Sequence, residues 1–286
     1  MSEFEKNITF VIVSFRSDNV IEKCLESISS NSKVIVVENS KNTSIKNYLE
    51  NKFSNVQVLI AGENLGYGRG NNLGISQVKT KYAFILNPDA YLDKNTLKEL
   101  KNVKDLLHEE FAILSPRIFD NKKNYNLIKV EKKLFIEVDF VKGFAMLLNL
   151  KKINFNEIFD RNFFLFLEEI DLCKRIKESG EKIYIAFNAK IYHGVKASSG
   201  NEFKIELCRN WHWMWSLYYY NFKHFGLFYA YKITSYKFIS SLLKISLSIL
   251  LMQKKKYLIH KYRLLGLINA YKKKDSWLRP DHINNF

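Results

Sequence analysis

The sequence predicts an α/β fold with a mainly parallel central sheet, followed by a C-terminal α-helical segment. Over the first 200 residues, apolar runs alternate with segments of helical spacing, and polar residues follow the ends of those runs. Strands that alternate with helices indicate βαβ units and parallel pairing. The composition changes after residue 200, and 286 residues leave room for one domain with an appendage. We therefore expect a domain over 1–200 and a basic, aromatic-rich helical region over 201–286.

Apolar runs predict the strands of this sheet. They are 8–15 (ITFVIVSF), 33–40 (KVIVVENS), 56–62 (VQVLIAG) and 81–92 (KYAFILNPDAYL). The first two are nearly continuous, as in strands that are buried on both faces. Further along, 135–149 predicts a strand, a turn around Gly143 and a second strand, and 182–194 predicts a strand that ends at His193.

Segments with apolar residues at helical spacing lie between these runs. They are 19–30, 44–53, 70–79, 94–109 and 163–180, the last with Gly180 as its C-cap. In such sheets, ligands bind at the carboxyl ends of the strands. Ser14, Glu38, Asn39 and Asp89 all occupy such ends, so we expect the site there.

A Gly-rich segment, ENLGYGRGNNLG, spans residues 63–74. It fails as a dinucleotide fingerprint, because the third glycine would fall on Asn71. We interpret it as a loop for close backbone approach, with Arg69 as a phosphate partner. A merely tight turn explains the glycines almost as well.

Several carboxylates and one histidine are candidates for chemistry. Asp89, behind Pro88 at a strand end, suits Mg²⁺ or Mn²⁺, which prefer oxygen ligands and substrate phosphates. Glu168 and Glu169 open a helix next to aromatic residues, where one carboxylate could serve as a general base. His193 could be a second metal ligand. Taken singly, each has an ordinary explanation: a turn, a helix-dipole complement or a core histidine.

The C-terminal region is strongly basic. The formal net charge is +16, and residues 201–286 contain 15 Lys/Arg against 4 Asp/Glu. Phe238, Leu242, Ile245, Ile249 and Met252 form an apolar stripe at helical spacing, with lysines on the other side. The charge implies an anionic partner, either a membrane or nucleic acid. No uncharged apolar run approaches the ~20 residues of a membrane span, so we expect contact with the surface of an anionic membrane. Packing on the domain, or a homodimer interface, is the alternative.

The N-terminus shows no signal-peptide core, and the three cysteines are dispersed. These features favour free thiols and a cytoplasmic protein, peripheral at the inner face of the cell membrane.

Taken together, the motifs resemble the inverting family 2 glycosyltransferases of GT-A fold, most closely the rhamnosyltransferase-like branch. The matching segments, in order from Val11 to Ser199, are VIVSF, CLESI, VIVVENS, NLGYGRGNNLG, LNPDA, GFAMLLN, FFLFLEEIDLCKR and YHGVKASSG. They cover about two-thirds of the chain. The resemblance implies a nucleotide-sugar donor (dTDP- or UDP-linked), a divalent cation, and a lipid-linked or oligosaccharide acceptor hydroxyl; it implies no nucleic acid.

The resemblance also assigns roles to residues. It implies that Glu169 is the catalytic base, and that Asp89 and His193 bind the metal. The residues expected to bind the donor nucleotide are Ser14, Glu38, Asn64, Gly66, Arg69, Asn72 and Asn87. The residues expected to line the acceptor or sugar pocket are Gly143, Phe144, Ala145, Glu168 and Asp171. Positions 38 and 169 are usually Asp in the family, and Asn87 replaces the first acid of the D-x-D motif.

Two other classes of protein remain open from the sequence. A non-catalytic membrane- or polyanion-binding protein on a decayed glycosyltransferase fold would explain the basic tail and the loss of Asp at positions 38, 87 and 169, although positions 38 and 169 remain acidic. A nicotinamide-dependent oxidoreductase would also be α/β, although the broken glycine fingerprint argues against it.

Overall fold

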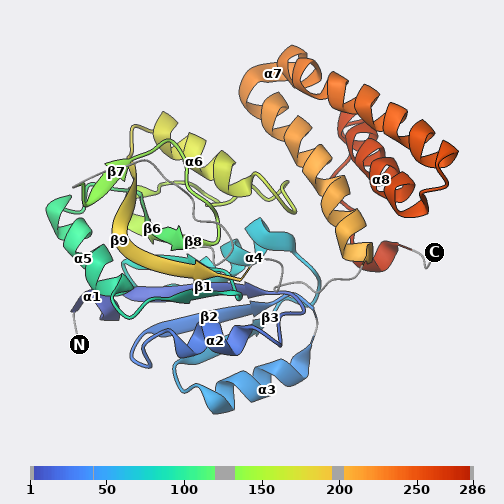
Figure 1. The fold of residues 1–286 in the computed structure, drawn as a ribbon. Coiled ribbons are helices and arrows are strands. Elements are labelled where there is room, and N and C mark those ends of the chain that lie inside the picture. Colours follow the sequence, from blue (N-terminus) through green and yellow to red (C-terminus); the bar gives the residue numbers. More distant parts are fainter. Residues whose placement is uncertain (1–2, 41, 120–132, 195–202, 284–286) are drawn as a thin grey trace. The chain divides into compact units, whose positions relative to one another are not determined.

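The computed structural model describes residues 3–40, 42–119, 133–194 and 203–283. These residues form two compact units (Figure 1). The first comprises residues up to 160 and 169–200, and the second comprises 161–168 and 201–286. The expected domain boundary at residue 200 stays a prediction, but segment 161–168, which we placed in the first domain, packs with the second unit.

A nine-stranded sheet forms the centre of the first unit. Its strands are β1 (Ile8–Ser14), β2 (Lys33–Glu38), β3 (Val56–Ile60), β4 (Tyr82–Leu86), β5 (Ala90–Leu92), β6 (Ile113–Phe119), β7 (Phe135–Glu137), β8 (Ala145–Asn149) and β9 (Ile183–His193). The order is β3-β2-β1-β4-β8-β6-β9-β5, and β7 also pairs with β9. The part β3-β2-β1-β4 is all parallel, as the alternation of strands and helices predicts.

The rest of the sheet is mixed, and it differs from the sequence prediction in three ways. Residues 81–92 form two strands instead of one, because β5 leaves β4 and pairs antiparallel with β9. Residues 135–149 contain two strands, but these are not neighbours: β7 pairs with β9, and β8 pairs with β4 and β6. Strand β6 was not predicted at all, since Pro116 interrupts its pattern.

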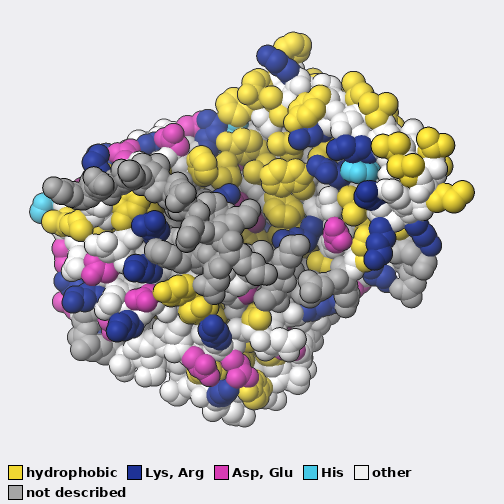
Figure 2. All heavy atoms as spheres, viewed as in Figure 1, with side chains coloured by type: hydrophobic (Ala, Val, Ile, Leu, Met, Phe, Trp, Pro, Cys, Tyr) yellow, Lys and Arg dark blue, Asp and Glu magenta, His cyan; other side chains and the backbone are white. Residues whose placement is uncertain are grey.

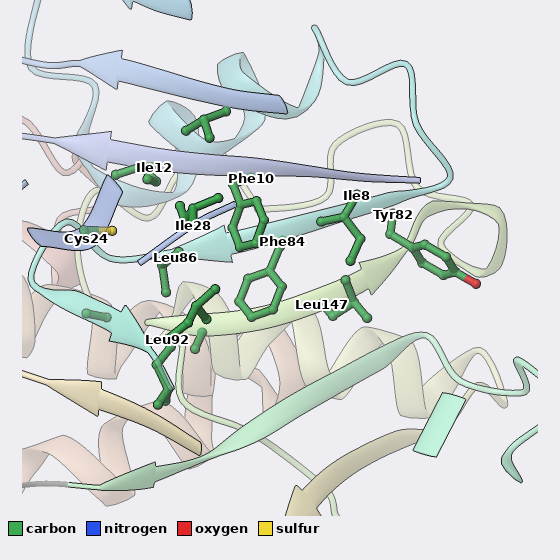
Figure 3. Close-up of a cluster of buried hydrophobic side chains, with 14 of the residues drawn as sticks. Ile8, Phe10, Ile12, Cys24, Ile28, Tyr82, Phe84, Leu86, Leu92 and Leu147 are labelled. Atoms are coloured by element: carbon green, nitrogen blue, oxygen red, sulfur yellow. The ribbon is translucent and has the colours of Figure 1, made fainter. Parts of the chain in front are cut away.

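Helices of the first unit cover both faces of the sheet. They are α1 (Glu3–Lys6), α2 (Ile21–Glu26), α3 (Thr43–Lys52), α4 (Gly66–Ile75), α5 (Thr96–Leu106) and α6 (Glu168–Glu178), with a 3-10 turn η1 at Leu150–Lys152. Because strand side chains alternate between faces, Phe10 and Ile12 pack with α1, α2, α3 and α5, while Val11 and Val13 pack with α4 and α6. Phe10 and Phe84 stack with their ring centroids 4.9 Å apart (Figure 3).

The second unit comprises α7 (Phe203–Leu250), α8 (Lys254–Tyr271), the C-terminal tail and segment 161–168. Helix α7 is interrupted at Gly226, whose φ of 84° is not helical, so it comprises two helices. Helix α8 packs against α7, and the 3-10 turn η2 (Pro280–His282) follows. Where Gly266 of α8 meets α7, an added Cβ would lie 2.2 Å from the Trp211 carbonyl oxygen. Only glycine fits at this crossing.

Hydrogen bonds tie the tail and segment 161–168 to α7. His212 Nε2 lies 2.7 Å from the Leu278 carbonyl oxygen, and Trp215 Nε1 donates to the Lys274 carbonyl at 2.8 Å. Ser216 Oγ donates to the Leu165 carbonyl at 2.8 Å. This bond holds segment 161–168 against α7, in the second unit.

Candidate active site

The carboxyl ends of β1 and β2 place a group of buried polar side chains side by side. Ser14 ends β1 and pairs with Glu38, which ends β2, and Asn39 follows Glu38. All three are at most 2% exposed. Ser40 donates its backbone N–H and its hydroxyl to Glu38 Oε1. Glu38 Oε2, Ser14 Oγ and Asn39 Oδ1 have no hydrogen-bond partner among the described residues. Buried polar atoms of this kind indicate a place for a polar ligand.

Helix α4 begins beside this group. The Asn39 side-chain amide donates to the Gly66 carbonyl at 3.0 Å, and Asn64 Oδ1 accepts from the Gly66 N–H at 3.0 Å. The predicted Gly-rich loop is therefore mostly helix, which begins four residues earlier than the predicted 70–79. Two of its glycines, Gly70 and Gly74, face the sheet. Added Cβ atoms there would lie 2.9 Å from Val13 Cγ1 and 2.4 Å from Val11 Cγ1. These glycines let the helix approach the sheet closely.

A second group lies where β4 ends and β9 ends. His193 pairs with Ala90 across the β5–β9 ladder, and the Gly194 N–H donates to the Asp89 carbonyl at 2.8 Å. This pairing brings His193 Nε2 to 3.3 Å from Asp89 Oδ1. The Asp89 side chain is 3% exposed and that of His193 21%. Although the two atoms face each other, neither makes a hydrogen bond to a described residue.

This pair meets the donor set that a divalent cation needs. Magnesium binds oxygen at about 2.0–2.1 Å, and imidazole nitrogen binds metals at a similar distance, so atoms 3.3 Å apart can share one cation. The described residues contain no cluster of three or more His, Cys, Asp or Glu that could hold a metal. A cation held by two protein ligands would complete its shell with water and substrate phosphates, which is the usual arrangement for Mg²⁺. The residues present therefore fit the cation.

Phe144 and Gly143 connect the Asp89–His193 pair to Glu169. The Phe144 ring stacks on the His193 ring, with centroids 4.3 Å apart, and its carbonyl accepts from the Asn87 N–H at 2.9 Å. Next to it, a Cβ on Gly143 would lie 3.2 Å from Glu169 Cβ. The structure thus brings five of the predicted residues, with Glu169, into one continuous set of contacts: Asn87, Asp89, Gly143, Phe144 and His193.

Two neighbours of this set were missed by sequence reasoning. The Tyr67 hydroxyl donates to the Gly143 carbonyl and so holds the residue beside Glu169. Cys24 Sγ donates to the Asn87 carbonyl at 3.5 Å. Burial raises the pKa of the Cys24 thiol, and the Asp89 carboxylate raises it further, so Cys24 remains a thiol donor. For Tyr67 a signal existed, since it directly follows Gly66 in the Gly-rich segment; for Cys24 there was none.

The acid pair lies at the start of α6, as the sequence predicts. Phe166 and Leu167 precede it with φ of 71° and 67°. Two consecutive apolar residues in the left-handed region store backbone strain, which commonly marks functional sites. Glu168 is buried at the first position of the helix.

Other predicted site residues have structural contacts. Asn72 donates its amide to the Phe159 carbonyl at 2.7 Å and accepts from the Phe159 N–H at 2.9 Å. Asp171 is fully buried and accepts from Arg175 Nε at 2.8 Å. Ala145 begins β8 inside the sheet, and its carbonyl accepts from Ser115. Arg69 is half-exposed, and its Nη2 lies 3.6 Å from Glu63 Oε1. These contacts tie Asn72, Asp171 and Ala145 to the scaffold.

Solved structures share this fold. The chain superposes on Staphylococcus aureus TarS 1-349 with a TM-score of 0.55 at 12% identity, covering 94% of this chain and 92% of that one. It superposes on GalNAc-T7, solved with UDP, GalNAc and Mn²⁺, with a TM-score of 0.56 at 12% identity, covering 78% and 51%. The GT-A fold that the sequence predicts is therefore confirmed.

Sequence comparison gives the family. The model of glycosyl transferase family 2 matches residues 9–166, so the chain belongs to this family and is a glycosyltransferase. The low-salt glycan biosynthesis hexosyltransferase Agl10 of Haloferax volcanii is 22% identical over 199 residues, 62% of this chain and 64% of that protein. The rhamnosyltransferase WbbL of Escherichia coli K12 is 25% identical over 221 residues, 65% of this chain and 83% of that one. Family membership excludes the oxidoreductase alternative and favours an enzyme over a non-catalytic protein.

Proposed function

We propose that this glycosyltransferase moves a hexose, with rhamnose as the favoured sugar, from a nucleoside diphosphate to a hydroxyl of a growing cell-surface glycan. The transfer inverts the anomeric centre and depends on a divalent cation. The observation that carries this proposal is the unbonded Asp89–His193 pair, which is linked through Phe144 and Gly143 to Glu169. The names of WbbL and Agl10 support the class of sugar and of product.

Asp89 and His193 would hold Mg²⁺ or Mn²⁺, and the bound cation would supply positive charge beside the departing diphosphate. Glu169 accepts the proton of the acceptor hydroxyl as that oxygen attacks the anomeric carbon. Attack on the face opposite the leaving group exchanges one C–O bond for another in a single step. The proton remains on the Glu169 carboxyl until it passes to solvent.

The nucleotide is assigned to the ends of β1 and β2. Glu38 Oε2 can accept the N3–H of uracil or thymine, so the donor is UDP- or dTDP-linked. Ser14, Asn39 and the start of α4, at Asn64 and Gly66, supply further polar groups, and a helix N-terminus favours phosphate. UDP in the complexes of TarS and GalNAc-T7, and Mn²⁺ in the latter, support this choice of ligands.

Glu169→Gln tests the assignment of the base. We expect this variant to lose nearly all transfer and donor hydrolysis, while its affinity for UDP with Mn²⁺, measured by calorimetry, remains that of the wild type. Glu178→Gln, at the exposed end of the same helix, is the matched control and should keep full activity. Full activity in Glu169→Gln, or no binding of any nucleoside diphosphate by the wild type, would refute the proposal.

A further inference from the structure

The second half of α7 distributes its side chains in an unusual way. Its buried side consists of small residues: Ala230, Thr234, Ser241 and Ser248. Its exposed side consists of large apolar residues, which we call the outer face: Phe228, Tyr236, Ile239, Leu243, Leu247 and Leu250. The apolar stripe that the sequence predicts is only partly exposed. Leu242 and Ile249 face solvent, whereas Phe238 and Ile245 are half-buried.

Hydrogen bonding within the helix explains how hydroxyl groups can occupy the buried side. Thr234, Ser241 and Ser248 each donate to the carbonyl four residues earlier, at 2.7, 2.8 and 2.6 Å. The hydroxyl groups of Ser241 and Ser248 are thus satisfied within the helix, and Thr234 Oγ1 also lies 2.9 Å from the Tyr271 hydroxyl of α8. The small side chains on the buried side of α7 leave room for α8 to pack closely. The large apolar side chains of α7 therefore face outward.

The outer face is strongly exposed. Phe228 is 85% exposed and Leu250 77%, and Met252, in the turn before α8, is 92% exposed. Figure 2 shows hydrophobic side chains gathered over the α7–α8 region, with Lys and Arg among them. Apolar patches larger than a few hundred Å² are uncommon on monomeric soluble proteins and mark an interaction surface.

Charge identifies the partner. Between Glu206 and Asp275 the sequence has thirteen Lys or Arg and no acidic residue. Lys232 lies on the exposed side of α7, and Lys254, Lys255 and Lys256 begin α8, directly after the exposed turn. Cations beside large apolar side chains complement an anionic bilayer, whose headgroups are negative and whose interior is apolar. Protein interfaces, in contrast, are depleted in Lys.

Helix α7 is the one helix in the described ranges that is long and apolar enough, by length and composition, to cross a membrane. Its second half nevertheless carries Lys232, Lys237 and Lys244 at intervals, so a crossing helix would place lysine in the hydrocarbon core. Gly226 also breaks the helix. In a helix that lies in the interface, by contrast, the lysines can reach the headgroups or water.

We propose that the outer face of α7 and the turn at Leu251–Met252 dock on an anionic lipid bilayer, with the helix parallel to the membrane plane. The apolar side chains enter the boundary between headgroups and acyl chains. The lysines of α7 and of the first turn of α8 contact lipid phosphates. The enzyme would then act on acceptors at the membrane surface.

Vesicle flotation of the full chain tests this, with phosphatidylcholine vesicles that contain or lack phosphatidylglycerol. We expect binding to the anionic vesicles, weakened by about tenfold or more in Leu243→Glu/Leu250→Glu, because two exposed apolar side chains that would enter the bilayer become charged. Lys254→Gln/Lys255→Gln/Lys256→Gln should also weaken binding and reduce its salt dependence. The matched controls are Leu106→Glu and Lys94→Gln/Lys98→Gln, exposed changes on the first unit, which should bind as the wild type does.

A second readout does not depend on these variants folding normally. The three native cysteines are buried, so an environment-sensitive dye will label Leu250→Cys selectively, with Leu106→Cys as control. Anionic vesicles should shift the emission at residue 250 to shorter wavelength and leave that at residue 106 unchanged. Equal binding of Leu243→Glu/Leu250→Glu, or no shift at residue 250, would overturn the proposal. So would a homodimer that this double variant dissociates, combined with no vesicle binding, since a second copy would then cover the face.

Discussion

Glu169 packs against the bare Cα of Gly143. A Cβ at Gly143 would lie 3.2 Å from Glu169 Cβ, 3.4 Å from its Cγ and 3.5 Å from Tyr67 Cε1. The two residues come from different parts of the chain, the turn before β8 and the start of α6. The position of the proposed base therefore depends on a residue without a side chain.

Gly143→Ala should displace the Glu169 side chain by a few tenths of an ångström. We expect the rate of sugar transfer to fall by about tenfold, because misplaced catalytic groups lose much of their effect. Affinity for UDP with Mn²⁺ should stay unchanged, since the nucleotide is assigned to β1 and β2. Gly143→Val should lose more activity than Gly143→Ala, and thermal unfolding checks that both variants fold. Wild-type rates in both variants would show that this contact does not position the base.

Asp89→Asn tests the metal assignment. It keeps the size of the side chain and removes its charge, so we expect UDP affinity in the presence of Mn²⁺ to fall by about tenfold or more. In chelator the wild type and the variant should bind UDP equally weakly. Asp105→Asn, an exposed change on α5, serves as control. If Asp89→Asn weakened UDP binding equally with and without Mn²⁺, Asp89 would contact the nucleotide directly and the cation would lie elsewhere.

The parallel half of the sheet could be predicted because β1, β2 and β4 are continuous apolar runs, each followed by polar residues. Strand β6 could not, because its sequence, ILSPRIF, contains a proline. The structure accommodates Pro116 by a register shift in the β6–β9 pairing between Pro116 and Arg117. Local patterns cannot show where a bulge will tolerate a residue that lacks an N–H.

The site was predictable to the extent that its residues end strands. Asp89 and His193 were both placed at strand ends, but their approach depends on the pairing of β5 with β9, which joins segments a hundred residues apart. The left-handed conformations of Phe166 and Leu167 have no local signal either, since apolar residues rarely adopt them. Tertiary packing determines both the approach of Asp89 to His193 and the left-handed conformations of Phe166 and Leu167.

Asn72→Ala separates a structural role from donor binding. Asn72 exchanges two hydrogen bonds with the Phe159 backbone, and its loss leaves both backbone groups unsatisfied, so we expect the free energy of unfolding to fall by about 1–3 kcal/mol. Far-UV circular dichroism in urea measures this, with the exposed change Gln77→Ala as control. Unchanged stability together with weaker UDP binding would instead support the donor contact that the family resemblance implies.

His212 should make the stability of the second unit depend on pH. Burial lowers the pKa of His212 from 6.5 to about 3, an effect that its hydrogen bond to Leu278 only partly offsets. The folded state therefore keeps the imidazole neutral, whereas the unfolded chain binds a proton below about pH 6.5. The contribution of His212 is fully present above that pH and is lost as the pH falls toward 3. Between pH 7 and pH 5 the loss amounts to about 2 kcal/mol.

Tryptophan fluorescence in urea measures this loss in the second unit alone, because all four tryptophans lie at positions 211, 213, 215 and 277. His212→Gln keeps a side-chain donor near the Leu278 carbonyl but cannot titrate. We expect it to be less stable than the wild type at pH 7 and to lose about 2 kcal/mol less on acidification to pH 5. His282→Gln, an exposed change in the same unit, should retain the wild-type slope. If His212→Gln showed the same slope as the wild type, carboxylates elsewhere would account for the acid sensitivity, and the imidazole would be protonated without unfolding.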